Sequence, residues 1–155
     1  MKYKENAEII KKYLDDNDWH YDMKDHGVAV VFRGGVSVGK SVFSSFQFTL
    51  AVEDDVVQNF VTLPVSAREK LAEIAEFVVR VNYPLKRGRM DLDISDGEVR
   101  YHICVPAAAV QADPNGTIED VLCLPSAMLI KYGKGIAEIL FNGVDAKTAY
   151  EHCEA

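Results

Sequence analysis

The chain has 155 residues, of which 48% are hydrophobic and 26% are charged, and this balance at ordinary domain length excludes a disordered protein. Its 24 acidic residues outnumber its 17 basic residues and give a net charge of −7. A negative field of this size disfavours binding to nucleic acid or to an anionic membrane surface.

No segment approaches the roughly 20 consecutive apolar residues of a membrane span, and charges interrupt the apolar residues at the N-terminus. The cysteines, Cys104, Cys123 and Cys153, are odd in number, widely spaced and without a CxxC pattern, which disfavours a disulfide framework or a zinc site. We therefore expect a cytoplasmic protein in which Cys104 and Cys123 are buried or half-buried free thiols.

The first half of the chain is predicted to form one helix followed by strands. Apolar residues recur with helical spacing from residue 5 to residue 17. The segments that follow are short, rich in β-branched and aromatic residues and separated by turn residues, which is typical of strands. The expected strands are 19–24, 28–32, 42–52 and 56–63.

The last two of these strands are expected to pair through an acidic turn. Their apolar residues then lie on one face, with the cross-strand pairs Phe46–Leu63, Phe48–Val61 and Val52–Val57. The other face is mostly polar, but it also carries Phe43 and Phe60. Aromatic residues on an open polar surface are favoured anchors for protein contacts, so these two phenylalanines are candidate partner-binding residues. The alternative is that they are scattered exposed residues without a role.

The segment from Ser66 to the end of the hairpin is predicted from local signals. Ser66 and Glu69 have the spacing of a capping box, which predicts a helix that begins at Ser66 and ends before Pro84. Asp96-Gly97 favours a two-residue type I′ turn. Counting outward from that turn predicts the pairs Ile94–Val99, Leu92–Tyr101, Met90–Ile103, Asp93–Arg100 and Asp91–His102.

The remainder of the chain is predicted to be helical. Thr117 and Asp120 suggest the cap of a helix that Pro125 should kink. Gly133 and Gly135 are expected to interrupt that helix, which resumes at 136–141. A final short helix is expected after Asp145, ending near Cys153. Strands grouped between helices and joined by short turns predict an α+β fold, an antiparallel β-sheet with helices packed on one face.

The run from Gly34 to Ser41 matches GxxxxGK[ST], the pattern of a loop that binds nucleotide phosphates. In such a loop Lys40 would meet the phosphates and Ser41 would hold Mg²⁺. The motif requires a helix to begin at the lysine, because the helix N-terminus is part of the phosphate site. The predicted strand 42–52 follows instead. We therefore expect a glycine-rich hairpin loop, and a nucleotide-dependent switch or enzyme is the alternative.

Other chemistry-bearing residues form no recognisable site. The histidines, His20, His26, His102 and His152, lie on separate predicted elements without metal-ligand spacing, and we expect His102 to pair with Asp91. The letters Gly35-Val36-Ser37-Val38-Gly39 fit GxSxG, but this run is expected to be a hairpin loop and not a nucleophile elbow. Most of the carboxylates fall in turns or on solvent faces. The basic run at 86–89 is expected to be a solvated loop. The sequence thus predicts no catalytic residue, cofactor-binding residue or metal ligand.

The run Asn82-Tyr83-Pro84-Leu85-Lys86-Arg87-Gly88-Arg89-Met90-Asp91-Leu92-Asp93, followed by 95–101, resembles the signature region of the bacterial YbjN domain family. Residues 63–65, 72–77 and 124–133 match that family in place, so the resemblance covers about residues 8–142. Residues 1–155 would be a single such domain, with a C-terminal helix at 145–153 appended. Pro84 replaces a usual glycine and Met90 replaces a usual aromatic residue.

The resemblance implies a fold similar to type III secretion chaperones, in which a curved antiparallel sheet carries helices on one side and the protein is often a dimer. It also implies a sensory transduction regulator without shared enzymatic activity or catalytic residues. We therefore expect a non-enzymatic cytoplasmic protein-binding module, chaperone-like or regulatory, that forms a homodimer, binds another protein and needs no cofactor. A small-ligand carrier with a pocket between sheet and helices is a further alternative.

Overall fold

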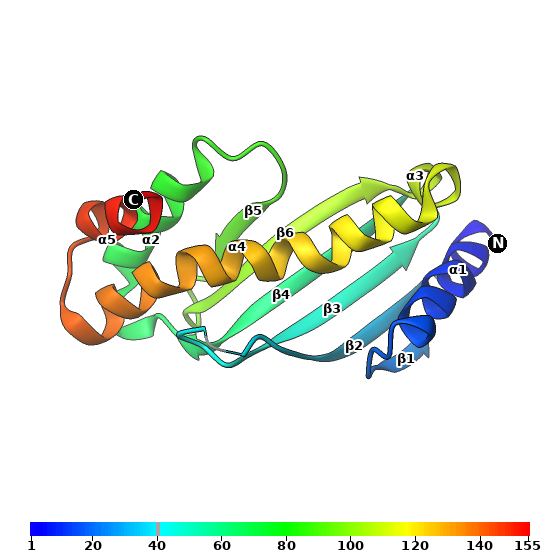
Figure 1. Ribbon diagram of the computed structural model, residues 1–155, viewed down its shortest axis with the longest axis horizontal. Coiled ribbons are helices and arrows are strands. Elements are labelled where there is room, and N and C mark those ends of the chain that lie inside the picture. Colours follow the sequence, from blue (N-terminus) through cyan, green and yellow to red (C-terminus); the bar gives the residue numbers. More distant parts are fainter. Residues whose placement is uncertain (40) are drawn as a thin grey trace.

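The computed structural model describes residues 1–39 and 41–155, which form a six-stranded antiparallel sheet with helices packed against it (Figure 1). The spatial order of the strands is β1-β2-β3-β4-β6-β5. The predicted α+β class is confirmed. The strands are β1 (Asp22–Asp25), β2 (Ala29–Ser37), β3 (Ser45–Glu53), β4 (Val56–Ser66), β5 (Arg89–Leu92) and β6 (Glu98–Pro106). The helices are α1 (Lys2–Asp16), the short 3₁₀ helix η1 (Arg68–Lys70), α2 (Leu71–Asn82), α3 (Ala107–Ala112), α4 (Pro114–Asn142) and α5 (Ala146–Glu154).

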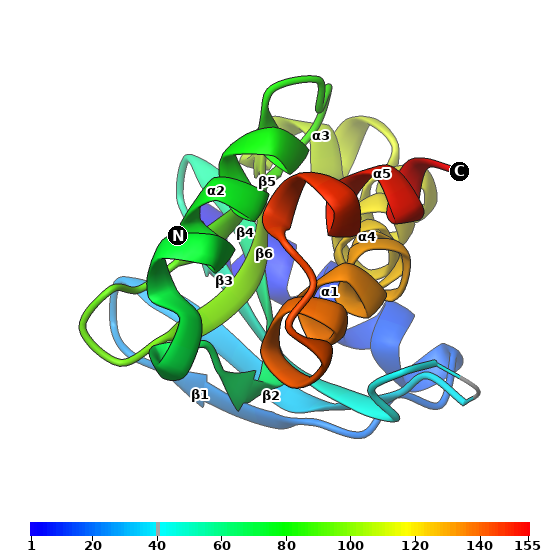
Figure 2. The ribbon, with the colours of Figure 1, turned by 90° about the vertical axis from the view of Figure 1, so that its left-hand side faces the viewer.

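The helices lie on the concave side of the curved sheet (Figure 2). The long helix α4 crosses β4 and β6, α1 contacts β2 and β3, and α2 contacts β5. Helix α5 packs against α2 and α4 at the end of the molecule away from α1. One sheet face is therefore covered by helices, and the hydrophobic core lies between these two layers.

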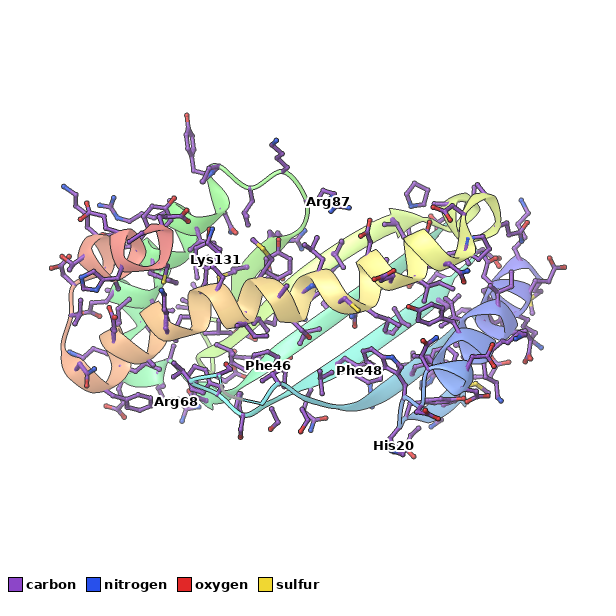
Figure 3. All side chains as sticks on the ribbon, viewed as in Figure 1. His20, Phe46, Phe48, Arg68, Arg87 and Lys131 are labelled. Atoms are coloured by element: carbon purple, nitrogen blue, oxygen red, sulfur yellow. The ribbon has the colours of Figure 1, made fainter. Side chains whose placement is uncertain are left out.

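The pairing of β3 with β4 follows the predicted register. Phe48 opposes Val61, Val52 opposes Val57, and Thr49 opposes Phe60. Phe46 and Phe48 are each 1% exposed and lie on the side of the sheet that carries the helices (Figure 3). The two-residue alternation of apolar side chains determines this register, because a slip of one residue would expose all of them.

The β5–β6 hairpin forms at the predicted place but in a register shifted by two residues, so the predicted pairs are wrong. Leu92 opposes Val99, Met90 opposes Tyr101 and Asp91 opposes Arg100. The loop is longer than a type I′ turn because the Asp93 carboxylate accepts hydrogen bonds from the amide and the hydroxyl of Ser95, at 2.9 and 2.6 Å. An even shift keeps each paired side chain on its predicted face. Ile94 lies in this loop and is 74% exposed.

The capping box predicted at Ser66 is also wrong. Ser66 is the last residue of β4, and helix α2 begins only at Leu71, after η1. The Ser66 hydroxyl donates to the carbonyl of Asp96 at 2.7 Å and accepts from the amide of Arg68 at 3.2 Å. Ser66 therefore ties the end of β4 to the β5–β6 loop.

Helix α4 is continuous from Pro114 to Asn142, so the predicted interruption at Gly133 and Gly135 is wrong. These glycines permit close packing, because a Cβ atom at Gly135 would lie 2.6 Å from the Phe77 ring and 2.8 Å from the Cys153 sulfur. The cap of α4 is Asp113, which accepts from the Gly116 amide, so the predicted cap at Thr117 and Asp120 is wrong as well.

The last helix begins where the sequence predicts, whereas two of the three cysteines are not buried as expected. Asp145 caps α5 by accepting from the Thr148 amide at 2.9 Å, which confirms that prediction. Cys104 and Cys123 are exposed rather than buried, whereas Cys153 is buried under α4. The burial expected for the first two thiols is therefore wrong.

A buried polar contact fixes α4 on the sheet. Pro125 has no N–H group, so the Val121 carbonyl loses the hydrogen bond that residue 125 would otherwise donate. Asn59, 0% exposed on the helix-facing side of β4, donates its side-chain amide to that carbonyl at 2.9 Å. Without this bond a buried carbonyl would be left unsatisfied, at a cost of about 1–3 kcal/mol.

We expect the Asn59→Ala variant to lose more stability in the native background than in a Pro125→Ala background. Alanine at 125 restores an N–H group for the Val121 carbonyl, while the cavity left by Asn59 is the same in both backgrounds. Urea unfolding of the four proteins should give a coupling free energy of about 1 kcal/mol. Additive effects would contradict the role assigned to this bond.

The two glycines of α4 give a second prediction. Gly135→Ala should destabilise the protein by about 1–3 kcal/mol, because its methyl group would overlap Phe77 and Cys153. Gly133→Ala is the matched control in the same helix. Its methyl group would come no closer than 3.3 Å to the Phe43 ring, and the higher helix propensity of alanine offsets this contact. Thermal unfolding of both variants tests the difference, and equal losses would contradict it.

Candidate protein-binding surface

The face of the sheet opposite the helices is open, and we call it the open face. It is formed by the residues that alternate with the core residues along each strand, including Val31, Thr49, Ala51, Gln58, Phe60 and Thr62. Its charged strand residues balance, since four are basic and four are acidic: Lys24, Arg33, Arg89 and Arg100 against Asp22, Glu53, Asp91 and Glu98. Asp93, just after β5, lies beside Arg89 and Arg100 and adds one negative charge. The open face is thus close to neutral in a chain whose net charge is −7.

Phe60 lies near the middle of the open face, as its place in β4 predicted, and it is half-buried. Its ring stacks on the imidazole of His102, the residue directly opposite on β6, with ring centroids 4.4 Å apart and planes within 6°. The Arg100 guanidinium lies over the same ring, 4.3 Å from its centroid. These two contacts hold the Phe60 ring in a defined orientation at the surface.

Phe43 does not lie on the open face, so its predicted placement on the same face as Phe60 is wrong. Strand β3 begins only at Ser45, and the chain before it turns toward the helices. Phe43 is 8% exposed and belongs to the hydrophobic core, where its ring faces Gly133 of α4. Its burial within the domain removes it from the set of candidate docking residues.

Arg100 is held in place by a carboxylate between two arginines. Asp91 accepts from Arg100 Nε at 3.1 Å and from Arg89 Nε at 2.8 Å. Both ion pairs are partly exposed, so each contributes little to stability but limits the orientations of the arginines. The predicted alignment of Asp91 with His102 is wrong, because Asp91 opposes Arg100 and Arg89 opposes His102.

His102 is buried in this cluster and is neutral at ordinary pH. Its Nε2 atom lies 2.8 Å from the side-chain oxygen of Gln58, whereas its Nδ1 atom is buried without a hydrogen-bond partner among the described residues. Burial lowers the pKa of His102, and the positive charge of Arg89 lowers it further. A protonated imidazole would place an unsatisfied charge beside Phe60.

The glycine-rich run is a hairpin in the part that the structure describes. Strand β2 continues through Gly34 and Gly35 to Ser37, which opposes Ser45 of β3, and the Val38 amide donates to the Ser44 carbonyl at 3.0 Å. Gly34 lies in the strand rather than in a loop, since it opposes Phe48 of β3. A side chain does not fit there, because a Cβ atom would overlap the His20 carbonyl and the Phe48 ring. Lys40 lies outside the described residues. Residues 41–53 form bends and strand β3, not the helix that a phosphate-binding loop requires.

A void between sheet and helices, lined by residues such as Ile10, Leu50 and Val121, has a volume of only about 10 Å³, far below the roughly 300 Å³ of the smallest usual ligand pockets. Among residues 1–39 and 41–155, no group of three or more His, Cys, Asp or Glu side chains is placed to hold a metal ion. Over the same residues, no helix is both long and apolar enough to cross a membrane.

Comparison of the chain with protein-family models, with curated proteins and with solved structures gave no significant match.

The lowered pKa of His102 gives a prediction about acid stability. In the unfolded chain an imidazole has a pKa of about 6.5. Below that pH the unfolded state therefore takes up the proton first, and stability falls as the pH falls. H102Q should lose less stability than the native protein between about pH 7 and about pH 5. Urea unfolding at several pH values measures this, with H26Q in an exposed turn as the matched control; parallel curves for H102Q and the native protein would contradict the assignment.

Proposed function

We propose that this protein is a non-enzymatic protein-binding module of the cytoplasm, chaperone-like or regulatory, that acts as a homodimer. The observation that carries the proposal is an open sheet face with an oriented aromatic side chain, Phe60, at its middle. The sequence resemblance to the YbjN family, with its chaperone-like fold and regulatory role, supports the same proposal.

A second copy of the chain is the occupant that we assign to the open face. In a twofold dimer the same surface of both subunits forms the interface, so the basic residues of that surface must meet its acidic residues on the other subunit. The open face meets this requirement because the charges of its four basic and four acidic strand residues cancel, and Asp93 adds only one negative charge. The rest of the molecule carries the surplus negative charge and would repel a second copy. Phe60 would supply the apolar anchor at the centre of such an interface.

Phe60→Ser should weaken the dimer at least about tenfold and leave the monomer folded, because the ring is only half-buried in the monomer. Sedimentation equilibrium of the variant and the native protein at matched concentrations measures the dissociation constant. Gln47→Ser is the matched control, because Gln47 is an exposed residue on the same face. A native protein that stays monomeric, or a dimer that tolerates Phe60→Ser, would contradict the proposed interface.

A further inference from the structure

We infer that the outer edge of β6 at residues 103–106, which we call the open edge, accepts an extended segment of the partner protein as an additional strand. This inference deepens the proposed function and rests on its protein-binding role. It concerns an edge of the sheet and not the centre of the open face around Phe60, so it does not require the dimer.

The open edge arises because β5 is much shorter than β6. Pairing between the two strands stops at Arg89 and His102, whereas β6 continues to Pro106 (Figure 1). On its other side β6 stays paired with β4 as far as Val56 and Pro106. The last four residues of β6 are therefore held in an extended conformation by one neighbour only.

The direction of the peptide groups follows from a close contact. A Cβ atom at Gly88, just before β5, would lie 2.8 Å from the His102 carbonyl oxygen, so this carbonyl points away from β4. Peptide groups alternate along an antiparallel strand, so the N–H and C=O of Cys104 also point outward. No segment of the described chain extends β5 to meet them. The open edge therefore offers the donor and the acceptor of Cys104, whereas the carbonyl of Pro106, the N-cap of α3, belongs to the first turn of that helix.

The outer edges of β5 and β1 are protected, whereas residues 34–37 of β2 extend past β1 and have no partner strand on their outer side, as residues 103–106 have none beside β5. At the outer edge of β5, Asn82 accepts from the Met90 amide at 2.8 Å and donates to the Met90 carbonyl at 2.9 Å. The side chain of Asn82 thus takes the place of another strand. At the opposite end of the sheet, β1 is short, fully exposed and mostly charged, which discourages pairing.

A groove of about 340 Å³ runs beside the open edge. One wall is the loop 86–88, the other is formed by α3 and the first turns of α4, and the apolar lining includes Val105, Pro106 and Ala109. Arg87 projects from the loop (Figure 3). Its guanidinium pairs with Asp120 of α4 at 2.6 Å. Lys86 is exposed and makes no ion pair within the described part of the chain. The groove therefore suits an extended segment with small apolar side chains and one carboxylate for Lys86.

The test uses short random peptides of about ten residues, displayed on phage and selected on the full-length chain. The selected peptides should carry β-branched residues at every second position, and one of the other positions should be acidic. Their affinity should fall at least about tenfold for Cys104→Pro, which removes the outward N–H, and should be unchanged for Cys104→Ala, which keeps it. Since that N–H does not point toward β4, the β4–β6 pairing survives in both variants.

Two further measurements keep the test decisive if Cys104→Pro does not fold. Lys86→Glu should weaken the same peptides at least about tenfold by reversing the charge that meets their carboxylate. Hydrogen exchange of the Cys104 amide in the native protein should slow on peptide binding. Selection of no peptide, equal binding to the proline and alanine variants, or no protection of the Cys104 amide would each overturn the inference.

The outcome can be separated from that of the proposed dimer. Phe60→Ser should bind the selected peptides with unchanged affinity, because Phe60 lies on the opposite face of the sheet. Peptides that lose binding in Phe60→Ser and retain it in Cys104→Pro would place recognition on the open face and overturn the assignment to the open edge. A monomeric protein that binds peptides at Cys104 would overturn only the dimer.

Discussion

The position of α4 on the sheet depends on one buried hydrogen bond between polar groups in an otherwise apolar layer. Pro125 leaves the Val121 carbonyl without a helical partner, and Asn59 of β4 supplies the missing donor. Apolar contacts alone would allow α4 to slide along the sheet at small cost, whereas a buried carbonyl has only one position that satisfies it. The same seating brings Gly133 over Phe43 and Gly135 between Phe77 and Cys153. The packing of α2 and α5 follows from that position.

Most of the fold could be predicted from sequence where one local pattern decided the outcome. Alternation in β3 and β4 determined their register, and Asp145 was an unopposed cap for α5. The prediction failed where two local signals competed. The bonds from Ser95 to Asp93 prevail over the type I′ preference of Asp96-Gly97 and lengthen the hairpin loop. At Gly133 and Gly135 long-range packing outweighs low helix propensity, which no local pattern records.

The candidate site was predictable only in part, for a related reason. Alternation along β4 placed Phe60 on the polar face, but the neighbours that orient its ring come from β6, about 40 residues away in the chain, and their alignment requires the β4–β6 pairing. Phe43 was misplaced because the strand pattern was extended through a bend that begins before Ser45. The open edge left no signal in the sequence, since it arises from the difference in length between β5 and β6.

The hydrogen bonds between Asn82 and Met90 couple the fraying of the end of α2 to the exposure of the edge of β5. Asn82 is the last residue of α2, where helices fray most easily, and its side chain covers the backbone of Met90. Fraying of that final turn uncovers a strand edge, so exposure of the edge has the free-energy cost of both events together. Strand edges seed the association of unrelated chains. The last turn of α2 thus protects the molecule against aggregation. How often that turn unfolds determines how often the edge of β5 is exposed to other proteins.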